Sequence, residues 1–399
     1  MSSTAPDTAP GGHLPGTRRP PAPRPSAPRL PRATAALRHA APALGAFLAV
    51  HLCGLLFLTV WAHRRHHGVW PLLATQWDAD WYLGIAEHGY AHRLGTAYDA
   101  NNLAFFPLYP LLVKAVAVLT PGSRASTGLG LTVLASFVAA WGVFAVGDRL
   151  HGRRVGVLLT ALWAALPVSL VQWMGYTESL FTALAAWTLY AVLRERWGWA
   201  ATGACLAGLT RPTGIAVAAA VSVAALLSLR RDRSPRAAVA AVAAPLGWCG
   251  YVGWVGLRLD RWDGYFAVQR LWHNEVDGGV ATLGRVRQLL GQGSRPELFL
   301  IMVTVTLFVS LALFAVSVWD RQPAPLLVFT GALLAIVVLS GGVYFPRARF
   351  LLPAFPLLIP LARHLSGTSR RHRGLVLATA VAVSAYCGSY MLLVWPSAP

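Results

Sequence analysis

The sequence predicts an all-α membrane protein that crosses the bilayer about eleven times. Of its 399 residues, 56% are hydrophobic and only 12% are charged, and the mean hydropathy is +0.52. Apolar runs of roughly 20 residues, the length at which a helix spans the hydrocarbon core, recur along the chain. This composition excludes a soluble fold.

Residues 1–36 are predicted to form a disordered cytoplasmic tail, and residues 37–399 one polytopic domain. The tail is rich in Pro, Ala, Ser, Thr and Arg and lacks apolar periodicity, so it cannot bury enough surface to offset the entropy of ordering. Its arginines either contact anionic lipid or are solvated without a partner. The first apolar run starts far from the N-terminus without a clear cleavage site, which indicates a retained span rather than a signal peptide.

The predicted membrane segments follow the apolar runs of the domain. Their ranges are 41–62, 128–147, 155–174, 177–193, 200–210 with 214–229, 237–258, 298–319, 324–343, 350–362 and 374–395. Residues 105–120 differ, because Pro107 and Pro110 interrupt a helix and Lys114 interrupts the apolar run. We expect this stretch to be a juxtamembrane or re-entrant helix.

The formal charge of +19 lies largely in the tail and in short loops. This pattern reflects bilayer orientation rather than nucleic-acid binding. With the tail inside, the alternation of segments places five basic loops on the cytoplasmic side. These loops are 148–154, 194–196, 230–233, 320–321 and 370–373. The basic cluster at 63–67 is the exception, because the alternation leaves it outside.

The same alternation brings polar loops together on the extracytoplasmic side. They contain residues 77–82, 175–179, 210–214, 272–275 and 346–349. Pro and Gly within them fit irregular backbone, which is tolerated at membrane depth only where protein or water covers it. The sequence therefore predicts one polar cavity built from five loops that are distant in sequence.

Acidic residues are scarce, which makes their placement informative. Only 15 Asp and Glu occur in the chain, and Asp78, Asp80 and Glu87 stand among Trp and Tyr in one short loop. A carboxylate can act as general base on an attacking alcohol, and arginine binds phosphate through its planar fork of donors. Aromatic faces support sugar rings. Together these groups indicate sugar transfer from a lipid phosphate at the outer membrane face.

Six stretches of the chain form an ordered set of motifs. They are WDADWYLGIAEHGY at 77–90, NLAFFPLYPLL at 102–112, GYTESLF at 175–181, LTRPTG at 209–214, YFAVQRLWHNE at 265–275 and PRARFLLPAFP at 346–356. In this order they resemble the PIG-V or GPI mannosyltransferase II family of GT-C integral membrane glycosyltransferases. The first two motifs are highly specific together, whereas GYTESLF and LTRPTG are weak alone. The resemblance covers roughly residues 40–395.

The resemblance implies a GT-C-type fold and an inverting transfer of mannose from a polyprenyl-phosphate-linked donor to an acceptor hydroxyl outside the membrane. Asp78 and Asp80 match the acidic loop of the family. One of them is expected to be the catalytic base and the other to position the acceptor or a water. GT-C enzymes with lipid-monophosphate donors mostly need no divalent metal, so no cofactor is assigned despite the DxD spacing. Dependence on a divalent metal remains an open alternative.

The expected setting is a bacterial plasma membrane, because Ala and Arg are abundant and Lys114 is the only lysine. Most bacteria make no GPI anchors, so the eukaryotic acceptor of the family is not expected to be the acceptor of this chain. The expected partners are a polyprenyl-phosphate-sugar donor, membrane lipid, and an envelope glycan, glycolipid or secreted protein as acceptor.

Further residues are candidates for binding the donor or the acceptor. They are Glu87, His88, Tyr109, Glu178, Arg211, His273, Arg347 and Arg349. Structural alternatives are open for the acidic ones. Asp78 and Asp80 fit an N-cap and first-turn charge of an interfacial helix at 80–89, and Glu178 fits a solvated helix start. Glu87 either supports the site or meets solvent.

The basic and aromatic candidates have structural alternatives too. Arg211 is expected to pair structurally within an apolar hairpin rather than to contact phosphate. Arg347 and Arg349 either snorkel towards headgroups or bind the donor phosphate. His273 either faces solvent or orients a substrate group. Tyr109, with Phe105 and Phe106, is expected to pack at the interface rather than to contact sugar.

Two other functional classes remain open. A transporter or flippase of lipid-linked sugars also needs a polar cavity. Its signature is inverted repeats or matched broken helices near the bilayer midplane, and the motifs are not repeated within the chain. A non-catalytic lipid-binding subunit shares the hydrophobic pattern without requiring the acidic loop. The isolated cysteines have neither disulfide nor metal-site spacing; they are Cys53, Cys205, Cys249 and Cys387.

Overall fold

The computed structural model describes residues 1–2, 32–96, 101–291 and 297–398 of the chain. Most of the predicted tail lies outside these residues. The described residues form helices and loops, with one isolated bridge between Val276 and Ser340. Helix α1 (Arg32–Arg64) begins ahead of the predicted domain start at residue 37. Residues 1–39 and 40–399 are two units, and the packing below is that of residues 40–399.

Six helices in the described ranges are long and apolar enough to cross a membrane. They are Thr34–Arg64, Arg124–His151, Gly214–Arg231, Pro235–Arg258, Leu298–Trp319 and Arg370–Leu393. Shorter apolar helices cover Leu108–Ala117, Glu178–Leu193 and Ala324–Leu339. The all-α polytopic class is thereby confirmed, whereas the count of eleven crossings stays a prediction.

The other elements follow α1 in chain order. They are α2 (Val69–Ala74), α3 (Asp78–His88), η2 (Asn102–Ala104), α4 (Leu108–Ala117), α5 (Arg124–His151), α6 (Arg153–Ala164), η3 (Ser169–Trp173), α7 (Glu178–Leu193), α8 (Trp197–Gly208), α9 (Gly214–Asp232), α10 (Pro235–Ala243), α11 (Leu246–Arg258), α12 (Gly264–Leu271), α13 (Val280–Gly291), α14 (Leu298–Trp319), α15 (Ala324–Leu339), α16 (Arg347–Phe350), η4 (Phe355–Leu358), α17 (Ile359–Gly367) and α18 (Arg370–Leu393). With 10 residues, α4 is about 15 Å long, half the hydrocarbon thickness. It agrees with the expected short helix within 105–120.

Three predicted segments are interrupted in the structure. Residues 155–174 comprise α6 and the 3₁₀ turn η3, and residues 237–258 comprise α10 and α11 on either side of Pro245. Residues 350–362 comprise the end of α16, η4 and the start of α17. Proline causes such breaks because it lacks an N–H and clashes with the preceding turn. Hydropathy does not register these breaks, since the flanking residues remain apolar.

Close contact between α5 and α6 depends on glycine. A Cβ at Gly147 would lie 2.9 Å from the Cα of Gly156, and one at Gly156 would lie 2.8 Å from the carbonyl oxygen of Phe144. Small residues are the usual means of helix association in membranes, where lipid removes most of the hydrophobic driving force. These two positions therefore hold α6 directly against α5.

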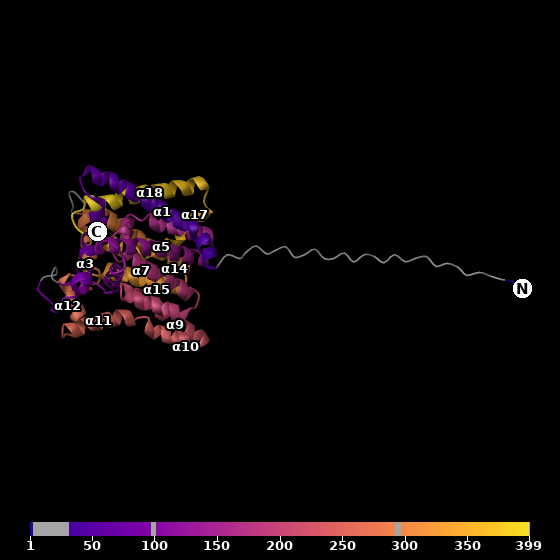
Figure 1. Ribbon diagram of the computed structural model, residues 1–399, viewed down its shortest axis with the longest axis horizontal. Helices are drawn as coiled ribbons and strands as arrows, with labels where there is room; N and C mark the ends of the chain where they lie inside the picture. Colours follow the sequence, from indigo (N-terminus) through magenta and orange to yellow (C-terminus); the bar gives the residue numbers. More distant parts are fainter. Residues whose placement is uncertain (3–31, 97–100, 292–296, 399) are drawn as a thin grey trace. The chain divides into compact units, whose positions relative to one another are not determined.

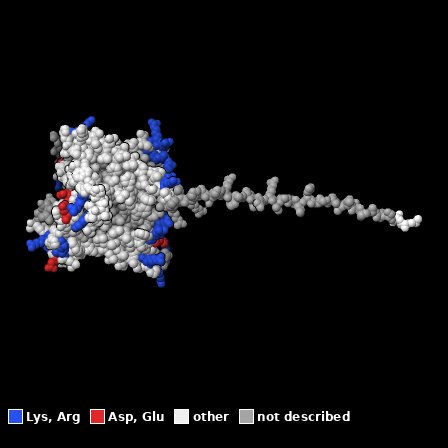
Figure 2. All heavy atoms as spheres, viewed as in Figure 1, with Lys and Arg blue, Asp and Glu red and all other residues white. Residues whose placement is uncertain are grey.

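The helices of residues 40–399 run side by side, so that their loops gather at two opposite ends (Figure 1). Charged side chains gather at these ends in the face shown in Figure 2, with a nearly uncharged band between them. At one end, loops predicted to be cytoplasmic approach each other, because Glu195 pairs with Arg231 at 2.7 Å. The opposite end carries α3 and α12. Which end faces the cytoplasm stays a prediction.

The loop before α13 is held against the end of α15. Val276 bridges Ser340, and the N–H of Asp277 donates to the carbonyl of Leu339 at 3.1 Å. The Asp277 carboxylate accepts N–H groups of Ala281 at 2.7 Å and Gly279 at 2.8 Å. These bonds, led by that from Ala281, lower the pKa of Asp277 below its ordinary value.

Replacing Asp277 with alanine is expected to lower the thermal unfolding midpoint at neutral pH. Because the pKa of Asp277 is lower in the folded protein, its stabilising contribution is present above the ordinary carboxyl pKa and is lost as the pH falls through the folded-state value. The difference in midpoint between wild type and Asp277→Ala in detergent should therefore shrink as the pH falls below the ordinary carboxyl pKa of about 4. Glu275→Ala, an exposed neighbour, is the matched control. A pH-independent difference would contradict this account.

Candidate functional site

The acidic loop begins with a strained residue. Trp77 immediately precedes α3 and has φ 53° and ψ −116°, a conformation that costs of order 1–3 kcal/mol for a residue other than glycine. It occupies the N-cap position of α3, and no side chain caps this end of the helix. The alternative that Asp78 is the N-cap is therefore wrong. Asp78 is instead the first helical residue, where the helix dipole favours negative charge.

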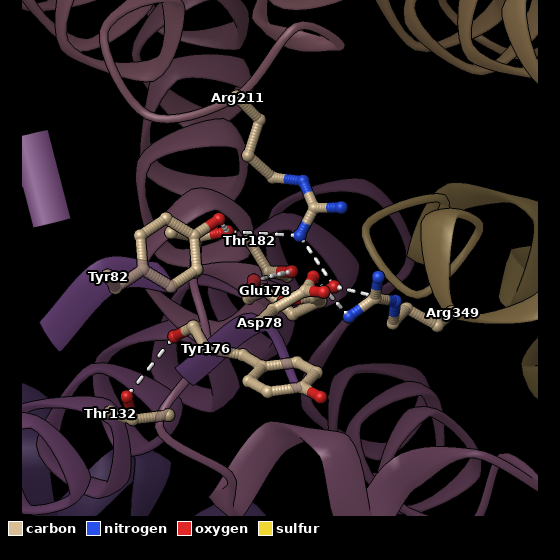
Figure 3. Close-up of polar contacts among 9 residues, drawn as sticks. Asp78, Tyr82, Thr132, Tyr176, Glu178, Thr182, Arg211 and Arg349 are labelled. Atoms are coloured by element: carbon tan, nitrogen blue, oxygen red, sulfur yellow. Dashed lines mark hydrogen bonds and ion pairs between the residues drawn. The ribbon is translucent and has the colours of Figure 1, made fainter. Parts of the chain in front are cut away.

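Asp78 joins three other ionic side chains in what we call the buried charge cluster: Asp78, Glu178, Arg211 and Arg349 (Figure 3). Arg349 Nη1 lies 2.6 Å from Asp78 Oδ2, and its Nε lies 3.5 Å from Glu178 Oε1. Arg211 Nη1 lies 2.6 Å from the same Glu178 oxygen. The side chain of Asp78 is 21% exposed, whereas those of the other three are at most 9% exposed. Two carboxylates and two guanidiniums thus balance each other within the protein.

Polar and aromatic neighbours support the cluster. Arg211 Nη1 donates to Thr177 Oγ1 at 3.1 Å, and the hydroxyl of Tyr82 lies 3.1 Å from the same oxygen. The Arg349 guanidinium lies over the Tyr176 ring, 4.9 Å from its centroid. Such contacts reduce the cost of burying an arginine away from water. The Thr177 hydroxyl therefore links Tyr82 to Arg211 of the cluster.

Burial decides between the alternatives for Glu178 and for the candidate arginines. Glu178 is 1% exposed, so the alternative of a solvated helix start is wrong. Arg347 is 2% exposed and Arg349 is 4% exposed, so neither snorkels towards headgroups. Arg211 has the structural partner expected for an intramembrane charge, Glu178. Glu178, Arg211 and Arg349 converge as expected, but they are enclosed by protein, whereas Arg347 lies elsewhere.

Asp80 lies apart from the cluster. Because α3 is helical from Asp78 onwards, side chains two positions apart diverge by about 200° around its axis. Asp80 is exposed, and within the described ranges its carboxylate makes no hydrogen bond or ion pair. The two aspartates therefore do not form a paired DxD site.

Aromatic rings adjoin the cluster along α3. Trp81 stacks on Phe105 with centroids 5.5 Å apart, and Trp272 meets Trp81 edge to face at 5.4 Å. The Tyr82 ring, whose hydroxyl contacts the cluster through Thr177, meets Phe105 at 5.2 Å. We call Trp81, Tyr82, Phe105 and Trp272 the aromatic wall. Apart from Tyr82 its members are partly exposed, as a surface for a sugar ring requires.

The remaining candidate residues lie outside the cluster. Glu87 is exposed and pairs with Arg124 at 3.3 Å, and His88 and His273 are also exposed. Tyr109 is buried, and its hydroxyl donates to the carbonyl of Gly128 at 2.9 Å, which agrees with a packing role.

Arg347 makes contacts in a different part of the protein from Arg349. It donates to Ser340 O at 2.6 Å and to the hydroxyl of Thr282, and lies over the Tyr344 ring. Arg347 thus links the first turn of α13 to the end of α15, and it does not join the cluster.

Sequence reasoning did not single out the neutral members of the network. Tyr82, Tyr176 and Thr177 occur within quoted motifs, but nothing assigned them roles. For Tyr176 and Thr177 the sequence did contain a clue, because they directly precede Glu178 at the start of α7.

The donor set around Asp78 is unlike a metal site. No group of three or more His, Cys, Asp or Glu in the described part of the chain is arranged to hold a metal ion. The charged groups that contact Asp78 and Glu178 are guanidiniums, which repel cations and attract phosphate. The contacts of Asp78 and Glu178 are thus those of ion pairs with arginine.

Comparison with known proteins gives a partial match in sequence. No family model matches the chain. Over 136 residues, 32% of this chain, it is 30% identical to GPI alpha-1,6-mannosyltransferase 2 of Rattus norvegicus, and to the same extent to that of Mus musculus. The match spans 26% of the length of these relatives. It supports the resemblance to the PIG-V family.

A solved structure also resembles the chain in outline. The Archaeoglobus fulgidus oligosaccharyltransferase, tethered to an acceptor peptide, aligns with a TM-score of 0.46 and 13% sequence identity. The alignment covers 88% of this chain and 56% of the archaeal one.

Replacing Glu178 with glutamine is expected to destabilise the protein by about 3–5 kcal/mol, because one carboxylate is then left to balance two buried guanidiniums. Glu195→Gln is the matched control, since Glu195 pairs with Arg231 at the surface and should contribute no more than about 1 kcal/mol. Unfolding in mixed micelles measures both.

Adding Arg211→Gln to Glu178→Gln restores the charge balance and should recover part of the lost stability. Equal effects of Glu178→Gln and Glu195→Gln, or no recovery in the double variant, would show that the cluster does not carry this energy.

Proposed function

We propose that the chain is an integral membrane glycosyltransferase that transfers mannose from a polyprenyl-phosphate-linked donor to an acceptor hydroxyl. The observation that carries the proposal is the partly exposed carboxylate of Asp78, held beside buried guanidiniums and an aromatic wall. The partial match to GPI alpha-1,6-mannosyltransferase 2 supports the same activity.

In this proposal Asp78 is the general base. Its Oδ2 is engaged by Arg349, and Oδ1 has no hydrogen-bond or ion-pair partner within the described ranges. Oδ1 takes the proton of the acceptor hydroxyl while the acceptor oxygen bonds to the anomeric carbon of the sugar. The bond from that carbon to phosphate oxygen breaks, and its electron pair leaves with the polyprenyl phosphate. Attack opposite the leaving group inverts the configuration.

Arg211 and Arg349 are proposed to stabilise the departing phosphate. Charge develops on the phosphate as the bond breaks, and fixed cationic donors in a desolvated site favour that state. Glu178 holds both guanidiniums in place when no phosphate is present. Asp80, exposed beside Trp81, is proposed to position the acceptor or a water, while the aromatic wall supports the sugar ring.

The proposed reaction takes place at the extracytoplasmic face of a bacterial plasma membrane. The end of residues 40–399 that carries α3 is the one that positive-inside orientation assigns to the outside, since loops such as 194–196 and 230–233 lie at the other end. The acceptor is then an envelope glycan, a glycolipid or a secreted protein.

Asp78→Asn is expected to lower the transfer rate by about 100- to 10,000-fold, because an amide cannot take the acceptor proton. Rates are to be measured per folded molecule, with folding checked by thermal unfolding in detergent. Asp80→Asn is the matched control from the same helical turn and should reduce transfer far less. Unchanged transfer in Asp78→Asn rules out the base assignment. Activity per folded molecule that stays at the wild-type level, with total activity falling only as the folded fraction falls, would assign Asp78 a structural role.

Purified protein is expected to turn over polyprenyl-phosphate-mannose when envelope lipid extract is supplied as acceptor, with products detected by mass spectrometry. Polyprenyl-phosphate-glucose in parallel tests the sugar, and transfer from glucose alone would overturn the choice of mannose. No transfer from either donor with any extract, by protein that is folded and binds donor, would favour a transporter or a lipid-binding subunit.

A further inference from the structure

An apolar groove of about 710 Å³ lies between α4, α5, α7 and α8. One end is lined by Tyr109 and Leu180, near the start of α7. The rim of the groove includes Leu134, Val138 and Trp199, which are 63%, 40% and 72% exposed. We call it the α7 groove, because α7 contributes residues along its whole length. Its wall is almost entirely apolar, as the binding of a hydrocarbon chain requires.

The floor of the groove is built from small residues. Ala183 and Ala191 of α7 and Gly203 of α8 line it. A Cβ at Gly203 would collide with the Thr188 hydroxyl, so α8 lies directly on α7 there. Thr188 is itself 1% exposed, lines the groove, and its hydroxyl has no hydrogen-bond partner among the described residues.

The two ends of the groove differ in charge. Arg194 and Arg196 line one end, are exposed, and make no ion pair or hydrogen bond through their side chains within the described ranges. Glu195 between them is already paired with Arg231. Helix α7 begins at Glu178 in the cluster and has 16 residues, so these arginines lie about 24 Å further along its axis. The groove therefore has a basic mouth at the end of the protein opposite the proposed active site.

We propose that the α7 groove binds one anionic phospholipid, with its phosphate at Arg194 and Arg196 and an acyl chain along the apolar wall. Two guanidiniums without partners form a phosphate site, and Trp199 lies beside them where aromatic residues meet headgroups. A donor lipid with its phosphate at Arg211 would bring only its apolar tail into the groove, and would leave the basic mouth without a counter-charge. This site is independent of the proposed function.

Native mass spectrometry of the full chain, titrated in detergent with phosphatidylglycerol, tests the proposal. The wild type should bind one phosphatidylglycerol in preference to phosphatidylcholine. Arg194→Gln with Arg196→Gln should weaken that binding by about 30-fold, equivalent to about 2 kcal/mol. Arg370→Gln with Arg371→Gln, an exposed pair in another basic loop, is the matched control and should bind as the wild type does.

A second variant tests the apolar wall. Ala135→Trp fills the groove and should abolish the bound lipid, whereas Val239→Trp, 67% exposed on α10 outside the groove, should leave it. The proposal is overturned if the Arg370/Arg371 variant loses as much phosphatidylglycerol binding as the Arg194/Arg196 variant. It is also overturned if the wild type binds phosphatidylcholine as tightly as phosphatidylglycerol. It is also overturned if polyprenyl phosphate displaces phosphatidylglycerol equally from the wild type and the Arg194/Arg196 variant, which would assign the groove to a lipid tail.

Discussion

The contact on which the site depends is the attraction of one buried carboxylate for two guanidiniums. Glu178 stands at the start of α7, Arg211 in the loop between α8 and α9, and Arg349 in the short helix α16. None of these charges is tolerable alone at this depth, so each segment is stable only where the others place their partners. This requirement brings together parts of the chain that are far apart in sequence, and Asp78 joins them through Arg349.

The charged side chains of the cluster lie close to points where helices are interrupted. The breaks between α6 and α7, around η3, and between α16 and α17, around η4, leave backbone groups without helical partners. Irregular backbone is tolerated in a membrane protein only where protein or water covers it. Here the packing covers it, as the Trp163 indole does by donating to the carbonyl of Leu352 at 2.9 Å. Polar side chains and irregular backbone thus share one protected region.

Sequence reasoning predicted the helical class, the main apolar segments and the convergence of distant polar loops, because charge and hydropathy report directly on the bilayer. It could not separate Arg347 from Arg349, which differ only in the direction that a four-residue helix gives each side chain. Nor could it place Asp78 and Asp80, because their divergence depends on α3 starting at Asp78 instead of residue 80. The neutral partners Tyr82 and Thr177 carry no charge pattern, so only three-dimensional contact reveals them.

The conformation of Trp77 has a further consequence for ligand recognition. Its unfavourable dihedral angles are already present in the folded chain, so the backbone ahead of Asp78 is bent before any ligand arrives. An incoming molecule then meets a carboxylate whose direction is set in advance, and its binding energy is not consumed in reshaping the loop. Residues that hold Trp77 in this geometry, although they touch no ligand, would therefore contribute to affinity by limiting reorganisation.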